Sequence, residues 1–518
     1  MIEYVMPPRL KLIIKCMPLL LFHSVLSFGS FSSHNHHASL NAISSHVPSN
    51  KLAKLSILNL HHREGGEIFQ IPDMKTLDFA RDFASSGAWG KHPILLRNAF
   101  LKEAQALKYH SDEAAATWPT WKDVMDLASD DEAEARLITH VTSDENSWSL
   151  ELGPIEDDDI PNRKSETKWT LVVNDVDRFH PCLSEWIGNV FNMIPQWRRD
   201  DGQISISNEG GGIGSHVDDY DVFLIQMSGT RKWDVGKRKI STREEIEGLI
   251  PSIDVRILDF WDGEIEKELV ESFMLEPGDV LYVPPRFGHR GTALSDGCMT
   301  LSVGLRAPSA KELMTKMSDD IVDAIDGKFL DRYTDPALLH KGALQASNAL
   351  DDNIKHEGKQ LIRDAINEML NDEENFDAFF GKLVTESKRM RFDYPMRLDD
   401  LDDECIQDLG VWGNSESAIN AVRKGEGVLY AAEGTSWAYS ILPDARSDCG
   451  DTLCRLFVDG TMRQLTLNKN DTATLKLIRC MVDQRQVNTT FFEKIVSAQF
   501  VELLEILVSA GYLYGSNE

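Results

Sequence analysis

Two histidines and an aspartate have the clearest potential for chemistry in this chain. His216 and Asp218 lie two positions apart in GGGIGSHVDDYDVF, so in extended backbone their side chains point to the same side. His289 follows EPGDVLYVPPRFG, in which a turn, an apolar strand and two prolines precede the histidine. Two histidines and one carboxylate on one face of a metal form the facial triad of non-haem Fe(II) oxygenases. The pattern therefore predicts an iron site formed by His216, Asp218 and His289.

A metal held on one face leaves the other face open for a bidentate 2-oxo acid and then dioxygen. The far carboxylate of such a cosubstrate needs a cation, and Arg231 can offer it a planar guanidinium. Lys232 is adjacent, but neighbouring side chains on a strand point to opposite faces, so only one of the two can face inward. Ser205, in the strand-like segment QISIS, can add a hydroxyl hydrogen bond. An ordinary strand-surface serine is an equally good interpretation of Ser205.

The glycines at 210–212 do not form a phosphate-binding loop, because no helix start and no G-K-[ST] sequence follows them. We expect them to provide backbone freedom close to the metal. A lone H-x-D pair is weak evidence for a metal site. Its place before a strand, the distant histidine and the β-rich surroundings together favour the metal site over coincidence.

The chain divides into four predicted regions. Residues 1–63 form a leader, and 64–308 mix a helical segment at 74–89 with many short strands, as in a β-barrel or double-stranded β-helix. Residues 309–391 carry apolar residues at helical spacing. Residues 392–518 alternate short strands and helices in the order of a small winged-helix unit. The predicted fold class is therefore α+β, and the lack of basic helices in the last region favours a protein-contact or structural role over DNA binding. The expected strands are ARLITHV, WTLVVNDV, QISISNE, DVFLIQM, RKWDVG, DVLYVP and CMTLSVGLRAP.

The charge balance limits the classes of partner. The 518 residues include 54 Lys+Arg and 83 Asp+Glu, for a formal net charge of −29. This balance excludes a general affinity for nucleic acid or anionic membranes and suits a basic protein partner. The 7 cysteines include no C-x-x-C pair, which indicates reduced thiols and not a disulfide framework or zinc site.

The leader differs from the rest of the chain. Residues 1–63 contain a single acidic residue, Glu3, together with a basic start, an apolar stretch at 12–28 and a tract rich in Ser, His and Asn. This composition predicts import into an organelle, either plastid or mitochondrion. The alternative is a disordered extension on a cytoplasmic or nuclear protein. A membrane anchor is disfavoured because Lys15 and His23 interrupt a short apolar run.

From about Phe79 to Tyr514 the chain resembles the bacterial ribosomal oxygenases, which are JmjC-type hydroxylases that modify an arginine of a large-subunit ribosomal protein. The resemblance implies Fe(II) held by His216, Asp218 and His289, with 2-oxoglutarate contacts from Ser205 and Arg231 and O2 as the oxidant. It also implies a cupin-like double-stranded β-helix, a helical dimerisation region and a winged helix. The segments that carry it include TKWTLVVNDVDRFHP, GGGIGSHVDDYDVFLIQ, EPGDVLYVPPRFGHRGTAL and LSVGLRAPS.

The sequence departs from that family at Asn208 and Glu209 before the glycines, and its leader suggests a eukaryotic, organelle-directed member. Histidyl hydroxylation and histone lysine demethylation are alternatives within the same superfamily. An inactive cupin-like peptide-binding module is a third possibility, which the intact metal and arginine positions disfavour. For a basic substrate, Asp219 or Asp221 could hold a guanidinium, although both could simply solvate the start of the strand.

Overall fold

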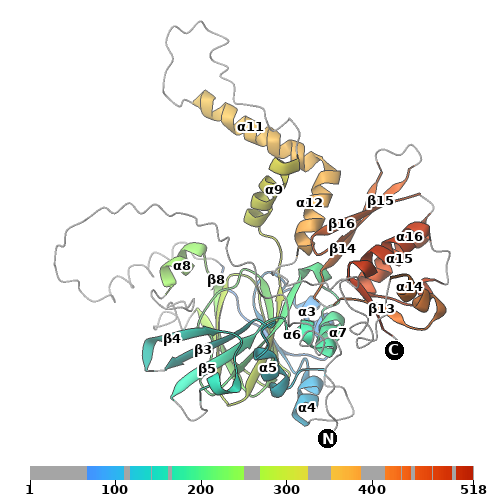
Figure 1. The fold of residues 1–518 in the computed structure, drawn as a ribbon. Helices are drawn as coiled ribbons and strands as arrows, with labels where there is room; N and C mark the ends of the chain where they lie inside the picture. The colour runs from blue at the N-terminus through green and yellow to red at the C-terminus, as the bar shows by residue number, and fades with distance from the viewer. Residues whose placement is uncertain are drawn as a thin grey trace, which may run out of the picture.

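In a computed structural model, a β-rich domain, a helical arm and a C-terminal domain follow each other along the chain (Figure 1). The structure describes residues 67–109, 117–141, 143–161, 166–249, 269–324, 352–386, 415–432, 434–444, 450–468, 471–492 and 497–516. The predicted leader at 1–63 lies outside these residues, so its targeting role stays a prediction. Within the described ranges, no helix is long and apolar enough to cross a membrane.

Two facing sheets form the β-rich domain. The large sheet has nine strands in the order β1-β2-β10-β7-β12-β6-β5-β3-β4, and the small sheet has the order β11-β8-β9. Neighbouring strands are antiparallel except β1 and β2, which pair in parallel. The strands of the large sheet are β1 (Asp73–Lys75), β2 (Ile94–Arg97), β3 (Ala135–Val141), β4 (Asp144–Leu152), β5 (Thr167–Val173), β6 (Arg199–Ser207), β7 (Asp221–Ser228), β10 (Val280–Val283) and β12 (Cys298–Leu305). Those of the small sheet are β8 (Arg231–Lys239), β9 (Val270–Leu275) and β11 (Phe287–Ala293).

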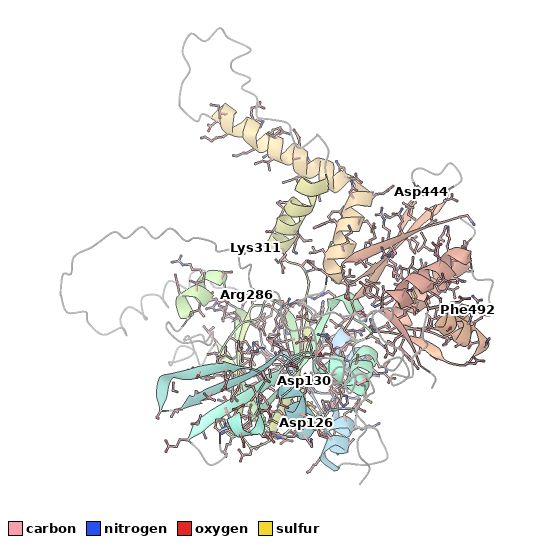
Figure 2. The ribbon with its side chains drawn as sticks, in the orientation of Figure 1. Asp126, Asp130, Arg286, Lys311, Asp444 and Phe492 are labelled. Atoms are coloured by element: carbon pink, nitrogen blue, oxygen red, sulfur yellow. The ribbon has the colours of Figure 1, made fainter. Side chains whose placement is uncertain are left out.

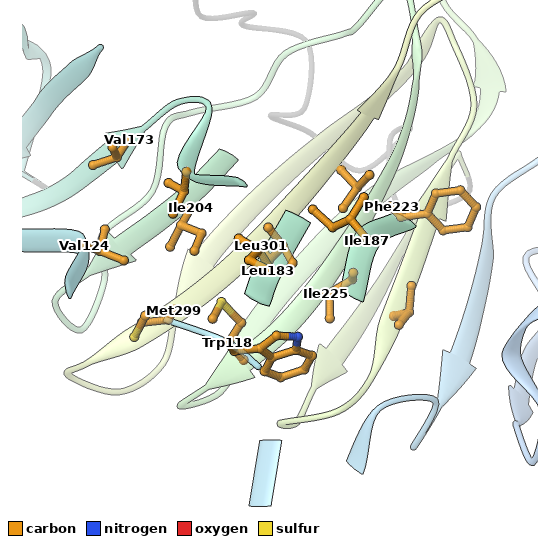
Figure 3. Packing of buried hydrophobic residues seen from close by; sticks show 14 of the residues in the cluster. Trp118, Val124, Val173, Leu183, Ile187, Ile204, Phe223, Ile225, Met299 and Leu301 are labelled. Carbon is orange, nitrogen blue, oxygen red and sulfur yellow. The ribbon is translucent and has the colours of Figure 1, made fainter. Parts of the chain in front are cut away.

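Strand β7 shows how the two layers are held together, because both of its faces are buried. Its odd-numbered apolar residues, such as Phe223 and Ile225, pack in a core with helices on the outer face of the large sheet (Figure 3). Its even-numbered residues Val222 and Leu224 pack against the small sheet. A continuous apolar run is what a strand covered on both faces requires. The helices that contribute to the outer core include α3 (Phe79–Ser86), α5 (Trp121–Ala128) and α7 (Pro181–Val190).

Three helices follow the barrel: α9 (Ala310–Ala324), α11 (Asp352–Asn371) and α12 (Glu373–Thr385). Helix α11 extends away from the rest of the protein, whereas α12 lies against a three-stranded sheet (Figure 1). That sheet consists of β14 (Trp437–Pro443), β15 (Thr452–Val458) and β16 (Thr461–Leu467). The buried Arg455 on β15 ties the two elements, donating to Asp377 Oδ2 at 3.0 Å and to the carbonyl of Glu374 at 2.6 Å.

The C-terminal domain has a hydrophobic core of its own. It also contains α14 (Ser415–Lys424), β13 (Val428–Ala431), α15 (Thr472–Gln484), β17 (Gln486–Val487), α16 (Ala498–Ser509) and β18 (Leu513–Ser516). The presence of sheets and helices throughout agrees with the predicted α+β class. The winged-helix assignment, the dimerisation role of the helical arm and the four predicted boundaries stay predictions.

Several elements differ from those predicted. The helix expected at 74–89 is shorter: β1 occupies its start, Asp78 caps α3, and Gly87 ends α3 with a φ of 65°. Strands β4, β9 and β11 were not among the expected strands. Strand β11 contains two glycines, an arginine and a histidine, so its sequence lacks the alternation of apolar and polar residues that marks a half-buried strand.

Replacement by alanine should change the stability of the protein in opposite directions at two helical glycines. A Cβ at Gly381 would lie 2.3 Å from the Phe457 ring, whereas a Cβ at Gly358 on α11 would meet nothing within 4 Å. Gly381→Ala should therefore destabilise the protein by about 1–3 kcal/mol through overpacking. Gly358→Ala should stabilise it by up to about 1 kcal/mol through helix propensity. Thermal unfolding midpoints measure both, and a midpoint for Gly381→Ala at or above that of the unmodified chain would contradict the packing.

Candidate active site

The loop after β6 runs antiparallel beside β11 and brings two distant histidines together. The amide of Gly210 donates to the carbonyl of Ala293 at 2.8 Å, and the amide of Ala293 donates to the carbonyl of Gly211 at 2.9 Å. Further along, His216 and His289 exchange amide-to-carbonyl hydrogen bonds of 3.1 and 3.0 Å. These bonds place the two imidazole-bearing residues directly opposite each other.

The glycines in this loop are needed because neighbouring backbone comes very close. A Cβ at Gly211 would lie 2.2 Å from the carbonyl oxygen of Trp169, and one at Gly212 would lie 2.3 Å from that of Gly291. Gly210 and Gly214 also have φ angles of 84° and 81°, a region that L side chains rarely adopt. The predicted role of the glycines, backbone freedom near the metal, thus has a specific cause in the close approach to β5 and β11.

His216, Asp218 and His289 converge as predicted. One ligand atom from each lies within 4.8 Å of the other two. The Asp218 Oδ2 atom is 3.4 Å from His289 Nε2 and 4.0 Å from His216 Nε2. Ligand atoms about 2.1 Å from a metal and at right angles to each other lie about 3 Å apart, so the three side chains must draw closer together to reach coordination distance. Two imidazoles and one carboxylate are the donors that a non-haem Fe(II) site requires.

The two imidazole rings are held in the tautomer that metal binding needs. The Nδ1 atom of each lies 3.1 Å from a backbone carbonyl, that of Gly214 for His216 and that of Phe287 for His289. A carbonyl only accepts, so Nδ1 carries the proton and Nε2 keeps its lone pair. Burial, followed by the neighbouring His216, lowers the pKa of His289 to about 4, which keeps this ring neutral at physiological pH.

Arg231 lies inside the barrel as the cosubstrate prediction requires. It is 2% exposed, and its Nη2 atom donates to Ser207 Oγ at 2.8 Å. Ser207 in turn shares a 2.9 Å hydrogen bond with Thr170 on β5. Among the described residues, the Nε atom of Arg231 has no hydrogen-bond partner. A buried donor of this kind is satisfied by an anionic ligand, so the residues fit a cosubstrate carboxylate.

Lys232 and Ser205 lie where strand alternation predicts. The Lys232 side chain is 42% exposed and pairs with Asp234 on the outer face at 2.9 Å, so of the two neighbours it is Arg231 that faces inward. Ser205 is buried on the same face of β6 as Ser207, and its hydroxyl lies 3.5 Å from the carbonyl of Thr300. That contact is long for a hydroxyl donor, so Ser205 can also bond to a ligand.

Sequence reasoning missed Trp233, which lies between Arg231 and the metal ligands. Its ring centroid is 5.8 Å from that of His289, and the Arg231 guanidinium carbon lies 5.9 Å from the Trp233 ring. A Cβ at Gly291, its partner across the strands, would come within 2.8 Å of the indole. Strand alternation could have found Trp233, because it lies two residues after Arg231 and therefore on the same face.

The acidic residues beside the metal ligands are already engaged. Asp221 is buried, and its oxygens accept hydrogen bonds from the Tyr282 hydroxyl at 2.6 Å and from Arg198 Nη2 at 3.0 Å. The prediction that Asp221 could hold a substrate guanidinium is therefore wrong, because an internal guanidinium occupies it. Asp219 is 83% exposed and pairs with Arg286 at 2.9 Å.

Comparison with known proteins gives concordant matches. A model of the JmjC domain family matches residues 187–313. The chain is 32% identical over 301 residues to the ribosomal protein uL16 3-hydroxylase of Escherichia coli, covering 58% of this chain and 70% of that protein. It is 31% identical over 324 residues to a probable ribosomal oxygenase of Haemophilus influenzae, covering 62% and 71%. The ribosomal oxygenase YcfD from Escherichia coli, solved with cobalt and 2-oxoglutarate, has a similar fold at 24% identity and a TM-score of 0.58, over 85% of this chain and 99% of that chain.

The loop after β6, which contains Gly212 and His216, lies close to β11. Gly212→Ala should therefore weaken metal binding. The added methyl group cannot fit 2.3 Å from the Gly291 oxygen, so the loop must move away from β11 and take His216 with it. Co(II) titration of the metal-free protein measures the effect. Gly236→Ala on β8 is the control, because its Cβ would make an ordinary contact at 3.4 Å. Equal Co(II) affinity in the two variants would contradict this account of the loop.

Proposed function

The chain belongs to the JmjC-type ribosomal oxygenase family, and on that premise we propose that it is an Fe(II)- and 2-oxoglutarate-dependent hydroxylase of a ribosomal protein. The observation that carries the proposal is the convergence of His216, Asp218 and His289 beside the buried Arg231. Both halves of the required chemistry, metal ligation and cosubstrate anchoring, therefore have matching residues in one barrel interior.

The residues of the site have distinct tasks in this reaction. Bound Fe(II) supplies the activation of dioxygen that couples decarboxylation of 2-oxoglutarate, giving succinate and carbon dioxide, to hydroxylation of a substrate carbon. His216, Asp218 and His289 would hold the metal, and three protein ligands would leave coordination positions for cosubstrate and oxygen. Arg231 and Ser205 bind the far carboxylate of 2-oxoglutarate and orient it. Burial of the ligand His289 and of Arg231 limits the access of water to their side of the site.

The proposed substrate is a basic ribosomal protein modified on an arginine side chain. The formal charge of −29 attracts basic proteins over several ångströms and raises their encounter rate. The name of the Escherichia coli relative identifies uL16 as the protein that the relative hydroxylates, which makes uL16 the first candidate here.

Mass spectrometry of ribosomal peptides tests the proposed function. Basic peptides of uL16 and other organellar ribosomal proteins, each containing arginine or histidine, are incubated with enzyme, Fe(II) and 2-oxoglutarate. We expect one added oxygen on an arginine, and none with Asp218→Ala, which removes the anionic ligand. Oxygen on histidine alone would assign the protein to histidyl hydroxylation. Loss of methyl groups from a histone peptide, with no oxygen on ribosomal peptides, would contradict the proposal.

Arg231→Ala should raise the KM for 2-oxoglutarate, because a charge-assisted hydrogen bond to the far carboxylate is lost. Hydrogen bonds to charged groups contribute roughly 1.5–3 kcal/mol, so the expected rise is about ten- to hundredfold. Lys232→Ala is the matched control, since that side chain lies on the outer face. An unchanged KM in Arg231→Ala would place the cosubstrate anchor elsewhere.

We also propose that the helical arm forms a homodimer. Met314 on α9 and Ile362 and Leu370 on α11 are 49%, 61% and 48% exposed, and a second copy could cover these apolar side chains. Light scattering should then give twice the chain mass of 58.3 kDa, whereas a monomer at micromolar concentration would rule the dimer out.

A further inference from the structure

Arg286 has a backbone conformation that is unusual for its side chain. It follows two prolines, precedes His289 by three residues, and has a φ of 72°. Residues other than glycine rarely adopt this left-handed region, because the Cβ crowds the neighbouring carbonyl. Such a conformation persists only where surrounding contacts hold it in place. The contacts of Arg286 therefore indicate what the strained residue is needed for.

These contacts join Arg286 to the loop after β6 that carries His216 and Asp218. Its amide donates to the carbonyl of Asp218 at 2.8 Å, and its Nη1 atom donates to Asp219 Oδ1 at 2.9 Å. The backbone of the metal ligand and the side chain of the next residue are thus both fixed by one arginine. Because Arg286 also leads into β11, the same residue connects the segments that carry Asp218 and His289.

A second set of contacts anchors Arg286 to the end of the small sheet and the helix after it. Nη1 also donates to Glu245 Oε2 at 2.6 Å, and Nε donates to the carbonyl of Ile240 at 3.0 Å. The amide of Ile240 returns a 2.7 Å bond to the Arg286 carbonyl. Glu245 lies on helix α8 (Thr242–Gly248) and is only 4% exposed, so this end of the contacts is buried. Figure 2 shows Arg286 beside α8.

We propose that Arg286 is a positioning residue of the metal site, which holds Asp218 in place by linking its loop to Glu245 and Ile240. The inference rests on the proposed metal-dependent function. In this proposal the exposed Asp219 binds Arg286 of the same chain. This role replaces the substrate contact that the sequence suggested for Asp219. Arg286 itself need not touch the metal or the cosubstrate.

Co(II) binding to the metal-free full chain tests the proposal without relying on turnover. Arg286→Gly removes the guanidinium contacts, while glycine tolerates the φ of 72°. We expect it to weaken Co(II) binding about ten- to hundredfold, the range found when groups that orient metal ligands are removed. Asp219→Ala should give a smaller loss in the same direction, and Arg286→Lys should recover part of the affinity. The KM for 2-oxoglutarate, measured at saturating Fe(II), should change little in all three.

Arg290→Ala is the matched control. Arg290 lies next to His289 but pairs with Asp234 on the outer face at 3.0 Å, so its loss should leave Co(II) affinity unchanged.

Wild-type Co(II) affinity in Arg286→Gly, with only a lower melting temperature, would overturn the proposal in favour of a purely structural role. Asp219→Ala is expected to fold because its side chain is exposed. Should that variant keep its Co(II) affinity but raise the KM for a ribosomal peptide, Asp219 would be a substrate contact and the proposal would fail. Absence of Co(II) binding by the wild-type chain would instead refute the proposed function itself.

Discussion

The paired backbone hydrogen bonds between His216 and His289 are the constraint on which the site depends. They hold two residues from distant segments opposite each other, as in an antiparallel ladder. Glycines 211 and 212 follow from this pairing, because any side chain there would push the loop away from its neighbours. Asp218 lies two residues further along the same loop, where its carbonyl accepts a 2.8 Å hydrogen bond from the amide of Arg286.

The barrel interior contains two environments. Apolar residues of β7, β9 and β10 fill one region, whereas Arg231, Ser207 and Thr170 form a buried hydrogen-bonded chain in another. Buried polar groups cost free energy unless they are paired. Within the described ranges, the Arg231 Nε atom and the Trp233 indole nitrogen have no hydrogen-bond partner. This region of the interior is therefore selective for a ligand rich in acceptor atoms.

The sequence was sufficient for features that depend on local pattern. Strand β3 coincides with the predicted ARLITHV, and His216, Asp218 and His289 were identified from residue type and spacing alone. Features that depend on tertiary neighbours were not predictable. Asp221 gave no sign that Arg198 and Tyr282 would bury it. Trp233 and Arg286 acquire their significance only once the facing strands and the supporting helix are known.

The order of strands in the large sheet has a consequence for biosynthesis. Strand β12 is the last of the barrel in sequence, yet it lies between β6 and β7 and pairs with both. While the chain emerges from the ribosome, β6 and β7 each have one edge without a hydrogen-bonding partner until β12 has been synthesised. Such late, non-local pairing slows folding and leaves strand edges exposed to other chains. Nascent chains of this protein should therefore depend on chaperones that shield apolar strands during synthesis.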